Sequence, residues 1–351
     1  MALDCSGAGC ELFMFNKFRD GQFGRPRELM RKTRLHRPDQ ASLVIEVAWR
    51  YYHDDQNQND IAQDLGLSRG TVVNYLNEAR ARGIVSIALK PEAFRELDLS
   101  QQLCERFGLA DALVVPTLEN VTEKQAIARV ARVAANWLPG VLVAGDMLGV
   151  SWGETTYEVS VAAPSVQLTD VTIVQLVGTL ATPLGFAAET CSSNLAQRFG
   201  STCLNLHVPL VVSSAELARR LREEPIIAQQ LAATRQCNKT LLAAGTCTPD
   251  SHVVKVGVVS EPQLRKFVKQ GAVGVICGQF IDADGKQIKS ELNERMLCVD
   301  IADMRNREMG ILVSSGASRA EAMRAAIKGG FATHLVTCAR TARAMLELPS
   351  G

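Results

Sequence analysis

The 351-residue sequence contains no run of about 18 uncharged apolar residues, the length that a helix needs to cross a membrane. Residues 1–18 include Asp4 and Glu11 and lack the uninterrupted apolar core of a signal peptide. The ten cysteines form no Cys-x-x-Cys pair, and no histidine stands at metal-ligand spacing. These absences predict a cytoplasmic protein with reduced thiols and with no membrane span, no metal and no cofactor.

An excess of charge of one sign is also absent. The sequence has 38 Lys and Arg against 37 Asp and Glu, so its formal net charge of +1 gives no overall attraction to nucleic acid. Any contact with nucleic acid must therefore come from a local surface. Hydrophobic residues make up 47% of the chain and charged residues 21%, which allows a large buried core. The length predicts two domains.

Residues 1–40 show neither helical nor strand periodicity, and from Lys17 to Gln40 eight Lys and Arg stand against three acids. We interpret residues 1–40 as a flexible basic arm. Such an arm is either a solvated leader or a DNA contact, and the sequence leaves both interpretations open.

Residues 41–90 contain three short segments of helical periodicity, followed by a strand pattern that Pro91 ends. Ala62 is small where two helices must approach closely, and Gly66 supplies the turn between them. The apolar positions suited to a shared core are Ile61, Leu65, Leu67, Val72 and Leu76. The pattern predicts a small, all-α, winged helix-turn-helix domain that binds DNA. An ordinary helical hairpin is the alternative.

The second helix of this motif would carry the DNA contacts, because Ser68 is a natural N-cap and the residues after it fall on the first turns. The residues that we expect at DNA are Ser68, Arg69, Gly70, Thr71, Asn74 and Arg80. Residues 41–90 hold five Lys and Arg against six Asp and Glu, so one copy would bind weakly. We therefore expect a homodimer or homotetramer on operator DNA.

After a linker helix expected within residues 91–108, β-branched runs alternate with helical periods. The runs are 112–115, 141–144, 171–177, 253–259, 273–276, 310–314 and 334–337, and the helical stretches include 124–138, 187–199, 215–231 and 318–329. Strands buried on both faces with helical crossovers predict an α/β fold. We expect a Rossmann-like, doubly wound parallel sheet over residues 109–351.

Loops that follow a strand and open a helix are where open α/β sheets hold ligands. One such loop combines glycines for close backbone approach with hydroxyls that suit phosphate or polyol oxygens. Its candidate residues are Gly149, Ser151, Gly153, Thr155 and Thr156. Gly316 and Arg319 repeat the arrangement and add a cation. Asp282 either accepts hydrogen bonds from sugar hydroxyls or belongs to a simple turn.

Four motifs in one chain carry a family resemblance. They are residues 68–85, the segment Gly145-Asp146-Met147-Leu148-Gly149-Val150-Ser151-Trp152-Gly153-Glu154-Thr155-Thr156, and residues 280–285 and 315–320. Over residues 43–348 the chain resembles the SorC family of bacterial sugar-responsive regulators. The resemblance implies a transcription regulator, such as a repressor, of a carbohydrate or polyol catabolic operon. Its effector would be a sugar, polyol or sugar phosphate bound in the C-terminal domain.

The chain departs from the family pattern at several of these positions. Gly70 stands where members commonly carry proline, and Val73-Asn74 where Ser-Arg is common. Thr179 replaces the second residue of a usual glycine pair, which makes it a further candidate effector residue. At Arg319 many members have lysine, and a planar guanidinium can clamp either a phosphate or hydroxyls. The departures imply that the operator sequence and the effector of this chain differ from those usual in the family.

Two alternative functions remain open at this point. A sugar-phosphate isomerase-like enzyme would have Asp146, Glu154 or Asp282 available, but no proton-transferring partner is identifiable, so we expect no enzyme. The sequence shows no desolvation of Lys239 or Lys255 that would make either a covalent trap. The second alternative is an effector-binding protein with a vestigial DNA-binding module.

Overall fold

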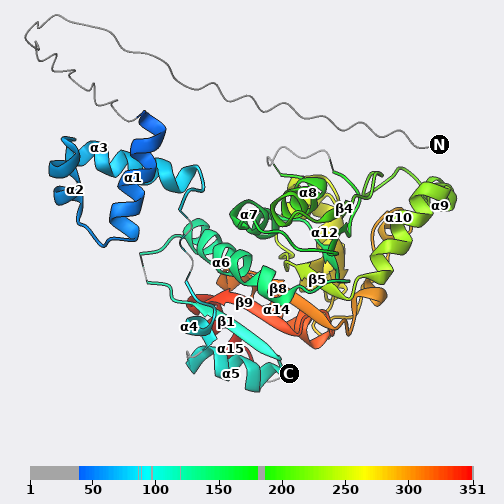
Figure 1. The fold of residues 1–351 in the computed structure, drawn as a ribbon. Helices are drawn as coiled ribbons and strands as arrows, with labels where there is room; N and C mark the ends of the chain where they lie inside the picture. Colours follow the sequence, from blue (N-terminus) through cyan, green and yellow to red (C-terminus); the bar gives the residue numbers. More distant parts are fainter. Residues whose placement is uncertain are drawn as a thin grey trace, which may run out of the picture. The chain divides into compact units, whose positions relative to one another are not determined.

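The computed structural model describes residues 39–349 except 86, 88, 96–97, 119 and 181–185. The chain divides into a small unit that ends at Val85 and a large unit that begins at position 86 (Figure 1). The predicted basic arm lies outside the described residues, apart from residues 39 and 40. The division falls a few residues before the boundary that Pro91 suggested.

The small unit consists of α1 (Gln40–Tyr52), α2 (Gln58–Leu65) and α3 (Arg69–Ala81). Its core includes the predicted Ile61, Val72 and Leu76. The expected strand is not found among the described residues of 84–90. The amides of residues 84 and 85 instead donate to the Ala79 carbonyl oxygen at 2.9 and 3.3 Å, so the end of α3 uses groups that a strand would need for its ladder.

The large unit is built on a seven-stranded sheet in which every pair of neighbours is parallel. In spatial order the strands are β1 (Asp111–Val115), β9 (His334–Cys338), β8 (Met309–Val313), β5 (Lys239–Leu242), β2 (Met147–Val150), β3 (Thr172–Gln175) and β4 (Thr202–Leu204). A separate antiparallel hairpin joins β6 (Gly274–Ile276) to β7 (Gln279–Ile281). The predicted doubly wound α/β fold is confirmed.

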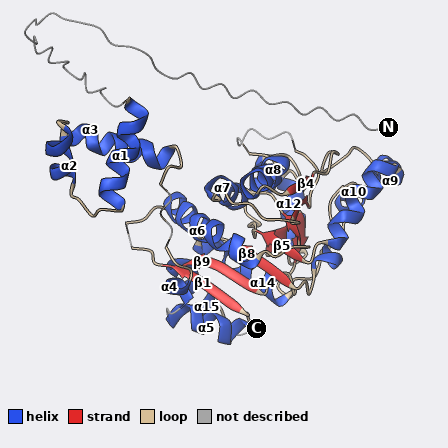
Figure 2. Cartoon of the chain, in the orientation of Figure 1, coloured by secondary structure: helices blue, strands red, loops and turns tan. Residues whose placement is uncertain are grey.

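Helices surround the strands of the large unit (Figure 2). They are α4 (Glu92–Arg95), α5 (Asp98–Phe107), α6 (Glu123–Trp137), α7 (Glu154–Ala162), α8 (Ala188–Phe199), α9 (Ala215–Glu223), α10 (Pro225–Gln236), α11 (His252–Lys255), α12 (Glu261–Lys269), α13 (Glu291–Glu294), α14 (Ala320–Lys328) and α15 (Ala339–Glu347), with 3-10 turns η1 (Leu138–Val141), η2 (Ile301–Met304) and η3 (Ala317–Arg319). No helix among the described residues has both the length and the apolar character that crossing a membrane requires.

Both faces of the sheet are buried. Along β1, Leu113 and Val115 enter the core formed with α6 and α8, whereas Ala112 and Val114 enter the core formed with α5, α12, α14 and α15. This alternation is expected of a strand with a hydrophobic layer on each side. Helix α5, which we expected to be a linker, packs on β1 and α15 as part of the large unit.

Four further element predictions were wrong in detail. The run 141–144 is not a strand, because the 3-10 turn η1 ends at Val141 and β2 begins only at Met147. The run 253–259 is not a strand, because Ser251 starts the short helix α11 and Gly257, with φ of 74°, follows its end. The run 273–276 belongs to the antiparallel hairpin instead of the parallel sheet. The stretch 215–231 is broken where Pro225 begins α10, since proline fits the first turn of a helix better than its interior.

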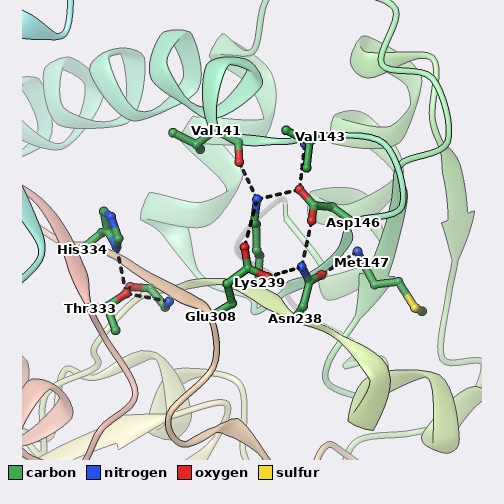
Figure 3. A network of polar contacts seen from close by, with 10 residues as sticks. Val141, Val143, Asp146, Met147, Asn238, Lys239, Glu308, Thr333 and His334 are labelled. Carbon is green, nitrogen blue, oxygen red and sulfur yellow. Dashed lines mark hydrogen bonds and ion pairs between the residues drawn. The ribbon is translucent and has the colours of Figure 1, made fainter.

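A buried ion pair joins the amino ends of two central strands (Figure 3). Lys239, the first residue of β5, places Nζ 2.7 Å from Asp146 Oδ2 and 2.7 Å from the Val141 carbonyl oxygen. Asn238 donates to Asp146 Oδ1 at 2.8 Å. Burial raises the pKa of Asp146, but the hydrogen bonds from Asn238 and Lys239 outweigh that effect and lower the pKa overall. The Asp146 carboxylate is thus held charged inside the fold.

Lys239→Met should lower the free energy of unfolding by about 3–5 kcal/mol, because it leaves the Asp146 carboxylate buried without its cation. The matched control is Lys286→Met. Lys286 lies 3.9 Å from Asp284 and both side chains are at least half exposed, so that change should cost less than about 1 kcal/mol. Urea denaturation measures both. Equal costs for the two variants would contradict a stabilising role for the buried pair.

Candidate functional site

The turn between α2 and α3 has the geometry of a helix-turn-helix. Gly66 adopts a left-handed conformation with φ of 63°, which glycine adopts without strain. The Leu67 amide donates to the Ala62 carbonyl oxygen at 2.8 Å, closing the end of α2. Ser68 caps α3 by accepting a hydrogen bond from the Thr71 amide at 3.0 Å. The residues that the sequence assigned to the turn and the cap therefore perform those roles.

The predicted DNA-contact residues share an accessible part of α3. Ser68, Arg69, Gly70, Asn74 and Arg80 are exposed. Thr71 is half-buried, and its hydroxyl lies 2.8 Å from that of Ser68.

Sequence reasoning missed Asn77, an exposed residue whose side-chain oxygen accepts a hydrogen bond from Arg80 Nη2 at 2.6 Å. The three-residue spacing on α3 was the signal that could have identified it.

The arginines of this unit differ in their partners. Arg50 pairs with Glu46 and Asp64, and Arg82 pairs with Glu78. Within the described residues, Arg69 and Arg80 instead bond neutral amide oxygens, Arg69 reaching Gln58 at 3.4 Å. The two arginines nearest the expected DNA surface therefore keep an uncompensated positive charge in a unit without a basic excess.

A cavity of about 270 Å³ opens beside the carboxyl ends of β2 and β5. Its walls come from the loop after β2, the loop after β5, the β6–β7 turn, the η3 segment after β8 and the start of α6. Strand order reverses between β2 and β5, since β3 follows on one side and β8 on the other. Such a reversal separates the outgoing loops and is where doubly wound sheets bind ligands.

Three of the predicted effector residues line this cavity, namely Gly153, Thr155 and Arg319. Gly149 supports it from β2, where an added Cβ would lie 2.7 Å from Leu176 Cδ2. Gly316 supports the loop after β8, where an added Cβ would lie 2.7 Å from Arg319 Nη1. Packing against the buried Leu176 therefore favours glycine at position 149, and a φ of 124° favours glycine at position 316.

The other predicted effector residues do not line the cavity. Ser151 and Thr156 are buried, and their hydroxyl oxygens lie 3.4 Å apart. The Thr179 amide donates to the Val208 carbonyl oxygen at 2.7 Å. Asp282 Oδ1 accepts from the amides of residues 284 and 286 at 3.0 and 2.8 Å, which is the simple-turn alternative.

Several cavity residues were not foreseen. Ser251 lines the cavity and is 6% exposed, and its hydroxyl oxygen has no hydrogen-bond partner among the described residues. Glu123, Asp250 and His252 also line it. Three of these four lie in the loop after β5 and at the start of α11. We did not predict that loop because the strand before it, β5, begins with the charged Lys239 and lacks the continuous apolar run that indicates a buried strand.

The cavity contains paired and unpaired charges. Arg319 Nη1 donates to Glu123 Oε1 at 2.8 Å and also to the Ser315 carbonyl oxygen. His252 Nε2 lies 3.9 Å from Glu154 Oε2. Burial lowers the pKa of His252, with the Glu154 carboxylate opposing the shift, so the ring is neutral at neutral pH. Hydroxyls, carboxylates and a neutral imidazole make this cavity suited to hydrogen bonding with a polar ligand.

The lowered pKa of His252 predicts a pH dependence of stability. A histidine in the unfolded chain titrates at about pH 6.5. On acidification the unfolded chain binds the proton first, so the contribution of His252 is complete above that pH and is lost as the pH falls below it. His252→Gln should therefore reduce the loss of unfolding free energy between neutral and acidic pH. Urea titrations at both pH values measure the slope, and an unchanged slope would exclude this role for His252.

Comparison with known proteins identifies the family. Residues 92–347 match the Sugar-bind family, a sugar-binding domain. The chain is 32% identical over 312 residues to the transcriptional regulator YjhU of Escherichia coli (strain K12), covering 87% of this chain and 95% of that protein. It is 31% identical over 316 residues to the deoxyribonucleoside regulator of Bacillus subtilis (strain 168), covering 88% and 98%.

A solved structure shares the fold. The full-length sorbitol operon regulator SorC from Klebsiella pneumoniae superposes with a TM-score of 0.71 at 23% identity, over 88% of this chain and 100% of that chain. The two relatives compared by sequence and the solved structure compared by fold thus each match this chain over nearly their whole length. The chain belongs to the Sugar-bind family, its relatives at 31% and 32% identity are transcriptional regulators, and it shares its fold with SorC.

Proposed function

We propose that this protein binds operator DNA through α3 and that a sugar, polyol or sugar phosphate in the cavity of the large unit changes that binding. The observation that carries the proposal is the exposure of Arg69 and Arg80 on the second helix of a helix-turn-helix, both without a carboxylate partner among the described residues. A vestigial module would have no reason to keep these charges uncompensated. The operon controlled would serve carbohydrate or polyol catabolism.

Arg69 and Arg80 have separate roles in this proposal. Arg69 lies in the first turn of α3, where side chains of a recognition helix meet base edges. An arginine there donates two hydrogen bonds to guanine in the major groove. Arg80 lies in the last turn, where it contacts a backbone phosphate. Ser68, Gly70, Thr71 and Asn74 complete the proposed surface.

The proposed active form is a homodimer or homotetramer. One recognition unit with few basic residues neutralises few phosphates and so gains little affinity. Two symmetry-related units bind two half-sites about one helical turn apart.

The regulator is favoured over the enzyme. Its relatives over nearly the whole chain are named transcriptional regulators. The cavity supports ligand binding through Thr155, Ser251 and Arg319, whose hydroxyls and guanidinium suit oxygen-rich ligands. Ligand binding to the folded state raises the melting temperature, so thermal-shift screening of sugars, polyols and their phosphates identifies the effector.

Arg69→Ala should weaken operator binding by about 1–3 kcal/mol, because it removes a base contact. Fluorescence anisotropy at one fixed salt concentration measures the change, since phosphate contacts make affinity salt-dependent. The matched control is Arg265→Ala, which removes a 64% exposed arginine from α12 of the large unit. If both variants bind the operator like the unaltered protein, Arg69 does not contact DNA.

Thr155→Ala should raise the effector concentration needed for a half-maximal change in operator binding, by about tenfold for one lost hydrogen bond to the effector. Thr202→Ala is the control, because Thr202 is exposed on β4 and does not line the cavity. The same anisotropy titration, run with and without the screened effector, reads out both. An unshifted response of Thr155→Ala would place the effector elsewhere.

A further inference from the structure

The guanidinium of Arg319 is already engaged by an acid of the protein itself. Arg319 is the one arginine among the described residues that line the cavity, and its side chain is 19% exposed. Its Nη1 atom lies 2.8 Å from Glu123 Oε1 and also contacts the Ser315 carbonyl oxygen. Both contacts use the Nη1 atom, so a phosphate clamped by the two-nitrogen fork would have to compete with the Glu123 carboxylate for that atom.

The ion pair lies directly beside the loop that follows β8. Gly316 has φ of 124°, and an added Cβ there would lie 2.7 Å from both Arg319 Nη1 and Glu123 Oε1. The Gly316 amide donates to the buried Thr341 hydroxyl at 2.8 Å. A side chain at position 316 would therefore collide with both partners of the ion pair.

The remaining charges of the cavity are unfavourable to a second anion. Among the described residues, three carboxylates line it, those of Glu123, Glu154 and Asp250, and the permanent cations there are Arg319 and Lys255. Glu154 occupies the first turn of α7, where a helix N-terminus would otherwise hold a phosphate. A phosphate monoester, with a charge of about −1.5 to −2, would enter a site already richer in negative charge.

Hydroxyl groups fit the same cavity better. The buried Ser251 hydroxyl lines it and has no hydrogen-bond partner in the described part of the chain, which is costly unless a ligand supplies one. A ligand hydroxyl can donate to a carboxylate and accept from Ser251, whereas a phosphate oxygen has no proton to give to Glu154 or Asp250. The indole of Trp152 also lines the cavity and offers an apolar surface to the carbon face of such a ligand.

We propose that the cavity takes an uncharged polyhydroxylated ligand, a free sugar or a sugar alcohol, and that Glu123 excludes sugar phosphates by occupying Arg319. This inference rests on the proposed function for the existence of an effector site. It names the class of ligand and assigns Glu123 as a specificity-determining residue.

The first test titrates inorganic phosphate into the full-length protein, with ionic strength held constant by sodium chloride. Glu123→Gln keeps the size of the side chain but removes the negative charge that neutralises Arg319, so phosphate affinity should rise by about tenfold or more. Replacing Arg319 by Gln in the same protein should abolish the gain. Glu261→Gln is the matched control, because Glu261 is an exposed glutamate paired with Arg265 outside the cavity.

The outcomes of this titration decide the role of Glu123. A gain in Glu123→Gln that requires Arg319 supports the proposal. Phosphate binding by the unaltered protein as tight as by Glu123→Gln overturns it, as does the absence of any gain. None of these measurements involves DNA, so they are independent of the Arg69→Ala result.

The second test decides the ligand class by thermal shift with matched pairs. The pairs are mannitol and mannitol 1-phosphate, ribose and ribose 5-phosphate, and fructose and fructose 6-phosphate. The largest stabilisation should come from an unphosphorylated member, and the gain should be reduced in Ser251→Ala. A larger shift with any phosphorylated member, or no shift with all six, overturns the proposed ligand class. The proposed regulator function would still be supported if Arg69→Ala weakens operator binding.

Discussion

Strand order in the large unit reverses between β2 and β5, and the functional features of that unit depend on this reversal. The two strands pair in parallel with Leu148 opposite Lys239. At their amino ends, the Lys239 ammonium lies 2.7 Å from Asp146. At their carboxyl ends, the chain leaves in opposite directions and the cavity opens. The same pair of strands thus carries a buried ion pair at its amino ends and a ligand-sized cavity at its carboxyl ends.

Local chemistry made much of the fold predictable. Gly66 and Ser68 define a turn and a cap within four residues, so the helix-turn-helix could be recognised without tertiary information. Strands with continuous β-branched runs, such as residues 171–177, were also predicted because both of their faces are buried. Strand β5 was not predicted because Lys239 replaces the first apolar position. Its charge is stabilised by Asp146, 93 residues away in sequence, and by the Val141 carbonyl oxygen.

The ligand residues were harder to predict than the elements that carry them. The residues of one motif are neighbours in sequence, but in the fold some of them line the cavity and others only support its walls. Gly149 is required by packing on Leu176, and Asp282 is used by its own turn. Ser251 and Glu123 come from the loop after β5 and the start of α6. Only the three-dimensional meeting of these segments reveals them.

The most direct test of the account is effector affinity measured twice by titration calorimetry, on the free protein and on its complex with operator DNA, at one salt concentration. If the cavity and α3 are coupled, operator DNA must change effector affinity by the same factor by which the effector changes operator affinity, typically about 5–150-fold. The account predicts equal and reciprocal factors. Identical effector affinity with and without the operator would contradict it.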